Sequence, residues 1–226
     1  MAAAELIFPA QSGLVRPRLR GWLHVWAFGL SIVAGVVLVA VTATARGPRG
    51  ALATSVYAGT VSLLFGTSAL YHRVVWSPRW HRLMARLDHS MIFLFIAGTY
   101  TPFALLVLPT RTGDVVLTVV WAGAAGGVGL KAVWIEAPPK VTVPLYLALG
   151  WVAVVVFPEL LRHGGVAAFV LLVAGGLMYS AGALVYAARR PDPVPHVFGY
   201  HEVFHLCTVV AALCHYLAVW LAVYSG

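Results

Sequence analysis

Seven apolar runs, each close to the length needed to cross a bilayer, limit what this 226-residue chain can fold into. A membrane-spanning helix needs about 20 predominantly apolar residues. Charged residues make up only 10% of the chain, against roughly 25% in an ordinary globular domain. We therefore expect an all-α integral membrane protein built as a bundle of seven transmembrane helices. The runs are Trp22–Ala45, Ala51–His72, Asp88–Leu108, Asp114–Trp134, Val141–Phe157, Gly165–Ala188 and Tyr200–Tyr224.

The predicted domain organisation is a short cytoplasmic tail, residues 1–21, followed by one transmembrane domain, residues 22–226. The tail contains VRPRLR, which is similar to the basic start of a signal peptide. The apolar run that follows is too long for a signal peptide and has no small-residue cleavage site. We interpret the segment as a tail that stays on the protein.

The basic residues predict the orientation, because Lys and Arg accumulate in cytoplasmic loops. Eleven lie in the tail and in the second, fourth and sixth loops, including Lys131 in the fourth, whereas four lie on the opposite side. The amino terminus should therefore be cytoplasmic and the carboxy terminus outside, in a multi-pass protein of the plasma membrane. The positive charge is spread over short loops, which does not favour nucleic-acid binding. Membrane lipids are the expected partners, and protein partners are unknown.

Polar side chains inside the runs gather at one end of three helices. The second run ends with Ser68 and His72, the third begins with Asp88, and the seventh begins with His201 and His205. Because the second run crosses in the opposite direction to the other two, all three groups should lie near the cytoplasmic face. Ionisable residues inside membrane spans are costly and by default mark a functional site.

This pattern favours a zinc site. His201 and His205 are four residues apart, so they share one helical face and can bind one ion, and His72 could supply a third nitrogen. Catalytic zinc commonly has three protein ligands and a water. Asp88 would hold or deprotonate that water, and Ser68 would orient Asp88 or the water. A single interfacial histidine is usually a packing or hydrogen-bonded residue. Three histidines, an aspartate and a serine at matched depth on separate helices favour metal binding.

The sequence HEVFH, which begins at His201, matches the zinc-protease pattern H-E-x-x-H. No Asp or Glu follows His205, and His215 is about 15 Å further along the helix, so we interpret the match as accidental. Glu202 should face a loop or water at the helix start. His89 is a candidate neighbour of the site, and His215 a buried residue lining an inner cavity. The remaining histidines are expected to be solvated: His24, His81, His163 and His196.

Four motifs, SALYH, LDHSMIFLFIAGTYTP, LVYAARRPDP and HEVFHLCTVVAALCHYLAV, give the chain a family resemblance from about His24 onward. The sequence resembles the hemolysin III family, bacterial relatives of the progestin and adipoQ (adiponectin) receptors. The resemblance implies a seven-helix bundle with a zinc ion on its cytoplasmic side. The motif Ser-x-x-x-His falls on Ser68 and His72, the aspartate on Asp88, and His-x-x-x-His on His201 and His205. It also implies zinc-dependent hydrolysis of lipid amides, an activity associated with receptor relatives and alkaline ceramidases.

Three functions remain open from the sequence. The first is a zinc-dependent hydrolase that acts on a lipid amide, in the manner of a ceramidase, from the cytoplasmic side. The second is a receptor-like or membrane-homeostasis protein in which zinc is structural. The third is a hemolysin-type pore former, which the spans favour weakly because they lack a repeated polar stripe.

Overall fold

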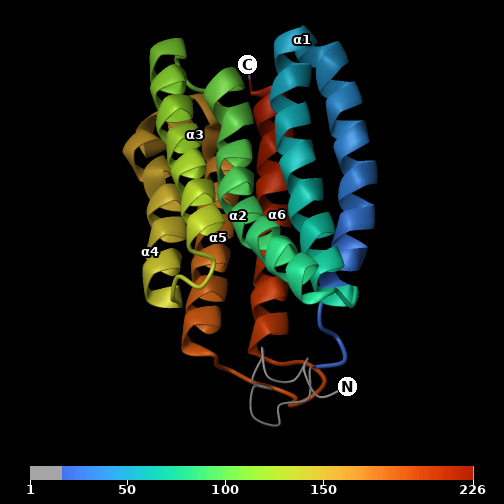
Figure 1. Cartoon of the computed structure of the whole chain (residues 1–226). Coiled ribbons are helices and arrows are strands. Elements are labelled where there is room, and N and C mark those ends of the chain that lie inside the picture. The colour runs from blue at the N-terminus through green and yellow to red at the C-terminus, as the bar shows by residue number, and fades with distance from the viewer. Residues whose placement is uncertain (1–16, 226) are drawn as a thin grey trace, which may run out of the picture.

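The computed structural model describes residues 17–225, and every regular element in that range is a helix apart from one isolated β-bridge between Val194 and Phe198. Most of the predicted tail lies outside the described residues. The all-α prediction is confirmed. The elements are α1 (Trp22–Arg73), α2 (Pro78–Leu106), α3 (Thr110–Val133), α4 (Pro139–Gly150), the 3-10 helix η1 (Trp151–Val156), α5 (Phe157–Ala188) and α6 (Tyr200–Tyr224), as Figure 1 shows.

The long helix α1 reverses direction at Gly47. This glycine has φ 64° and ψ −160°, a backbone conformation that residues other than glycine rarely adopt, and Pro48 follows it. The two halves lie side by side in Figure 1, and the Ser31 and Ser62 hydroxyl oxygens are 3.0 Å apart between them. Two of the predicted runs, Trp22–Ala45 and Ala51–His72, therefore form a helical hairpin.

A second reversal occurs within α5. Gly165 has φ 79° and ψ 163°, which ends the first part of the helix. The indole nitrogen of Trp151 donates to the Ser180 hydroxyl at 3.0 Å, so the later part of α5 packs against η1. The run predicted as Val141–Phe157 is accordingly divided among α4, η1 and the first residue of α5.

Five helical segments are long and apolar enough to cross a membrane: α1, α2, α3, the α4–α5 segment and α6. Their outer faces carry large apolar side chains, such as Leu30 at 71% and Trp26 at 69% exposed. In water such a surface would cost much free energy, whereas a bilayer covers it. The protein is thus an all-α, multi-pass membrane protein.

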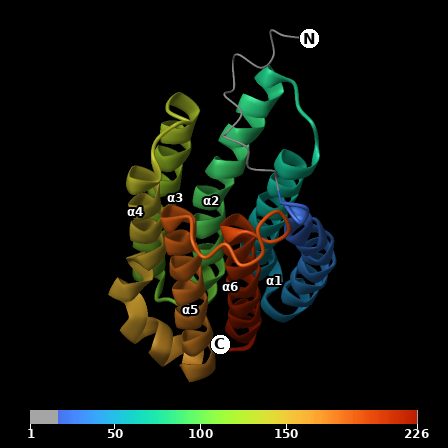
Figure 2. The same cartoon turned by 90° about the horizontal axis from the view of Figure 1, so that it is seen from below.

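The helices form a closed ring. Each helix contacts the next along the chain, and α6 contacts α1 to complete the circle. Figure 2 shows this arrangement from below, with α1 and α4 on opposite sides. α2 also reaches across to α4 and α6, so residues from most of the helices can line one central space.

The start of α2 differs from the prediction. The third run was expected to begin at Asp88, but α2 begins ten residues earlier, with Ser77 before it and Pro78 at its first position. Proline suits the first turn of a helix because the backbone N–H groups of that turn have no carbonyl partner within the helix, so the N–H that proline lacks is not missed. The segment before Asp88 is too basic to count as an apolar run, yet it is helical, so Asp88 lies in the middle of a helix.

Candidate metal centre

Three histidines meet where the end of α1 lies against the start of α6. His72 is in the last turn of α1, and His201 and His205 are one turn apart in α6. One ring nitrogen from each lies within 4.8 Å of the others. The Nε2 atoms of His72 and His201 are 3.2 Å apart. His72 and His205 are buried and His201 is partly buried, so the structure brings the three predicted ligands together.

The donor set of this cluster fits a zinc ion. Imidazole nitrogens bind zinc at about 2.0–2.1 Å, so two of them on a tetrahedral ion lie about 3.3 Å apart. The separation of 3.2 Å between the His72 and His201 nitrogens matches that value. Nδ1 of His205 is buried and has no hydrogen-bond partner among the described residues. The set contains three histidines and no carboxylate, which is a ligand number typical of catalytic zinc.

His24 is a fourth histidine at this centre, and the expectation that it is solvated is wrong. Its side chain is buried, and its ring stacks on that of His205 with centroids 3.8 Å apart and planes 12° apart. Neither of its ring nitrogens has a hydrogen-bond partner among the described residues. The first half of α1 runs parallel to α6. His24 contacts His205, and further along both helices the Tyr216 hydroxyl donates to the Ala34 carbonyl. The sequence does not specify this pairing of helices.

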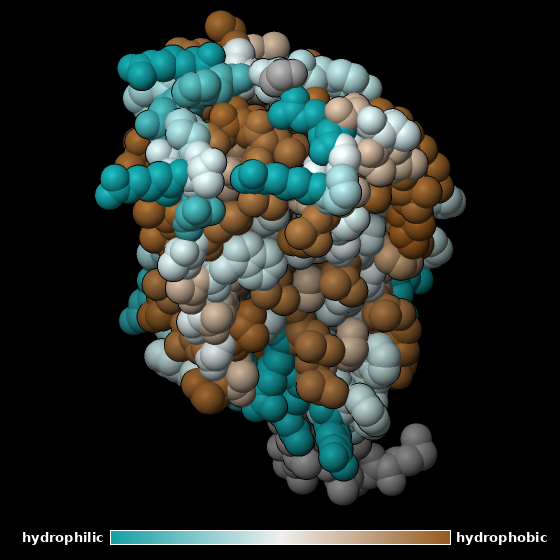
Figure 3. Space-filling model, turned by 90° about the horizontal axis from the view of Figure 1, so that it is seen from above, coloured by the Kyte–Doolittle hydropathy of each residue, from teal (hydrophilic) through white to brown (hydrophobic). Residues whose placement is uncertain are grey.

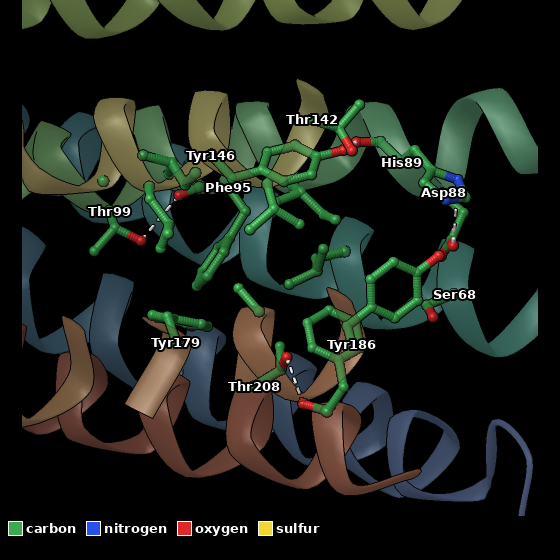
Figure 4. A pocket seen from close by; sticks show the side chains of 18 of the residues that line it. Ser68, Asp88, His89, Phe95, Thr99, Thr142, Tyr146, Tyr179, Tyr186 and Thr208 are labelled. Atoms are coloured by element: carbon green, nitrogen blue, oxygen red, sulfur yellow. Dashed lines mark hydrogen bonds and ion pairs between the residues drawn. The ribbon is translucent and has the colours of Figure 1, made fainter. Parts of the chain in front are cut away.

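Ser68, Asp88 and His89 form a polar group at one end of the cavity, as Figure 4 shows. Ser68 lies beside the Asp88 carboxylate. Nδ1 of His89 lies 4.0 Å from the Asp88 Oδ2 atom. Tyr146 of α4 donates to the His89 backbone carbonyl at 3.2 Å. Ser68 is one turn before His72 on α1, so it links the aspartate of α2 to the helix that carries one of the histidines.

Glu202 does not face a loop or water, as the sequence suggested, but is fully buried. Its Oε1 atom pairs with the Arg20 guanidinium, and its Oε2 atom accepts from the Gly199 backbone N–H at 2.9 Å. The carboxylate thus caps its own helix and ties it to the residues before α1. Both oxygens have partners, which supports the interpretation that the protease-like pattern is accidental.

A cavity of about 820 Å³ connects these groups. His72, His201, His205, Ser68 and Asp88 line it at one end. Apolar residues of α2, α4, η1 and α5 line much of the remainder, with Phe103, Val156 and Leu160 toward the opposite end of the bundle. The cavity therefore offers a polar end that contains the candidate ligands and a long apolar part.

The sequence predicted one of the other cavity-lining histidines and assigned two further residues to loops. His215 is partly buried in α6 with Nε2 3.2 Å from the Leu172 carbonyl oxygen, as expected for a residue lining the cavity. His81 was placed in a loop but belongs to α2 and also lines the cavity. Lys131 was assigned to a loop, yet it lies in the last turn of α3, 1% exposed. Its position on the buried face of α3 was the signal that could have identified it.

Comparisons with known proteins identify the family of this chain. The family model described as "Haemolysin-III related" matches residues 12–216. Hemolysin-3 of Bacillus cereus is 36% identical over 162 residues, covering 70% of this chain and 71% of that protein. The Hemolysin-3 homolog of Bacillus subtilis is 30% identical over 176 residues, 78% of this chain and 79% of that protein.

A plant protein extends the relationship to the receptor-like branch. The Heptahelical transmembrane protein ADIPOR2 of rice (Oryza sativa subsp. japonica) is 32% identical over 158 residues, covering 59% of this chain and 65% of that protein. The family match spans most of the chain. The chain belongs to the haemolysin-III related family, which is related to the progestin and adipoQ receptors.

Proposed function

We propose that this protein is a zinc-dependent hydrolase of the plasma membrane that cleaves a lipid amide, or a similar membrane substrate, near the cytoplasmic face. The observation that carries the proposal is the three-histidine cluster, whose nitrogens lie within 4.8 Å of one another and which lines the same cavity as Asp88 and Ser68. A polar reacting end joined to a long apolar space suits a substrate with a polar linkage and an acyl chain.

The proposed topology has seven crossings. The reversals at Gly47 and Gly165 divide the two longest helical segments, and the printed name of the rice relative describes a heptahelical protein. The start of α1 and the end of α6 lie at opposite ends of the bundle in Figure 1, which supports an odd number of crossings. Although Lys131 belongs to a helix, the other basic residues still favour a cytoplasmic amino terminus.

Reporter fusions test this orientation. A reporter fused after Gly226 should be active only outside the cell, and a reporter inserted near Arg79 only in the cytoplasm. The opposite pattern would move the histidine cluster to the outer face and contradict access from the cytoplasmic side.

In the proposed reaction, His72, His201 and His205 would hold the zinc ion. Bound there, zinc would supply a Lewis acid that polarises the substrate carbonyl and activates water at neutral pH. Asp88 would accept the proton from the attacking water and return it to the leaving amine. Ser68, which lies beside Asp88, would keep the carboxylate directed toward the cavity.

Asp88→Asn separates a catalytic site from a structural one. The variant should keep its zinc but lose on the order of 10²-fold in turnover, the usual scale for loss of a general base. The assay offers short-chain ceramides and related lipid amides to the detergent-solubilised protein. His72→Ala serves as a metal-deficient control.

Two results together would contradict the hydrolase. These are no turnover of any lipid amide or ester by the wild type, and loss of both zinc and thermal stability in Asp88→Asn. They would indicate that Asp88 is a ligand of a structural zinc that ties the helices together.

A further inference from the structure

Lys131 is a buried cation on a helix face that is otherwise small and apolar. It lies in the last turn of α3 and is 1% exposed. A charged side chain on such a face of a membrane helix is costly and by default marks a functional position. The other buried residues of α3 recur every three or four positions along the same face: Gly113, Val116, Val120, Ala124 and Gly127.

Helix packing places Lys131 at the level of the candidate metal centre. Gly127, one turn before Lys131, packs against Phe93 of α2 so closely that a β-carbon there would overlap the ring. α2 and α3 are antiparallel, so one further turn along α3 corresponds to one turn back along α2. Lys131 therefore lies at the height of His89, on the side of the cavity formed by α3 and α4.

Within the part of the chain that the structure describes, Lys131 has no ion-pair partner. Among residues 17–225, no carboxylate oxygen lies within 4.0 Å of its amine, and no hydrogen bond involves it. Arg20, a second cation that lines the cavity, is paired with Glu202. Asp88 lies 4.0 Å from Nδ1 of His89, and Glu136, in the loop that follows α3, is exposed. Lys131 is thus the buried cation of the cavity that can accept an anionic group from a ligand.

Thr142 adds a hydroxyl to the same region. It is 5% exposed, lies in the first turns of α4 and lines the cavity. Figure 4 shows it beside Tyr146 and His89. A lysine and a hydroxyl together suit a carboxylate or a phosphate, because both groups can donate hydrogen bonds to oxygen atoms.

We propose that Lys131 forms an anion subsite of the cavity, which binds the carboxylate or phosphate of a single-chain amphiphile while the acyl chain follows the apolar wall. This inference rests on the proposed function in one respect: it would make the substrate a lipid amide whose polar part carries a negative charge. The level of Lys131 would place that charge beside the histidine end and leave the amide within the same space.

The binding experiment compares three probes that share one acyl chain length. These are N-lauroylglycine, which carries a carboxylate, dodecyl phosphate, and the uncharged N-lauroylethanolamine. Affinity is measured for the zinc-loaded protein in a neutral detergent, using wild type, Lys131→Met and Lys140→Met. Lys140 is an exposed lysine in the first turn of α4 and is the matched control.

The wild type should bind at least one anionic probe on the order of tenfold or more tightly than the neutral probe, as expected for a charge-assisted hydrogen bond. Lys131→Met should lose this preference and keep its affinity for the neutral probe, whereas Lys140→Met should behave as wild type. Preference for N-lauroylglycine alone would identify a carboxylate site, and preference for dodecyl phosphate alone a phosphate site.

Equal affinity of the wild type for charged and neutral probes would overturn the proposal. An unchanged preference in Lys131→Met would do the same. If Lys131→Met unfolds, Lys131→Gln takes its place, with the same expectations. These outcomes are independent of turnover. Hydrolysis of both amides without selective binding would contradict the anion subsite and support the hydrolase. Selective binding without hydrolysis would support the anion subsite and contradict the hydrolase.

Discussion

The two ends of the helix bundle bury different kinds of polar side chain. At the histidine end, five charged or imidazole side chains are buried, and several of them interact across helices. They are His24, His72, Lys131, Glu202 and His205. At the opposite end the buried polar residues are threonines such as Thr42 and Thr54. Figure 3 views the molecule from that end, where scattered hydrophilic groups lie among apolar ones.

The difference shows how packing residues can be told from site residues in a membrane bundle. The Thr54 hydroxyl donates to the Gly50 carbonyl of its own helix at 2.9 Å, so it needs no partner from elsewhere. Glu202 instead needs Arg20, which comes from the segment before α1. Buried groups that depend on other helices are costly to retain, and they gather where the candidate metal centre and its cavity lie.

The largest expected effect on stability comes from removing Arg20. Arg20→Gln leaves Glu202 buried without its cation, and breaking one partner of a buried ion pair costs about 3 kcal/mol in the free energy of unfolding. Glu202→Gln should cost less, on the order of 1 kcal/mol, because the amide oxygen can still accept from the Gly199 N–H and Arg20 is partly solvated. Unfolding in a detergent titration measures both. Equal effects of the two substitutions would contradict this asymmetry.

The smallest effect is expected at the opposite end, and it provides the matched control. Thr54→Val keeps the shape of a fully buried side chain and removes only a bond to its own helix. The free energy of unfolding should change by less than about 1 kcal/mol, and zinc content should not change. A loss comparable to that of Arg20→Gln would show that the two ends do not differ as described.

The sequence predicted the helical architecture and the meeting of the three histidines because both depend on simple periodicity. Runs of about 20 apolar residues determine the crossing helices, and spacing along them determines the depth of His72 and His201. Lateral contacts were not accessible in the same way. The stacking of His24 on His205 depends on which helices are neighbours in the ring, and nothing in either helix alone specifies that neighbour.

Residues near the ends of the runs were the hardest to interpret. Glu202 was placed at a solvated helix start because its partner Arg20 lies 182 positions away in the chain. Lys131 was counted among the loop cations, although the three- and four-residue spacing of small residues before it continues through its position. The start of α2 was missed because its first turns are basic and amphipathic, a pattern that apolar-run analysis does not detect.

Metal analysis combined with X-ray absorption at the zinc edge tests the central claim most directly. The purified wild type should contain about one zinc per chain, coordinated by three imidazole nitrogens and one further light atom from water. The double variant His201→Ala, His205→Ala should lose the metal, whereas His163→Ala, which changes an exposed histidine, should keep it. A zinc ion held by four protein ligands, or a zinc content unchanged in the double variant, would contradict a catalytic centre formed by His72, His201 and His205.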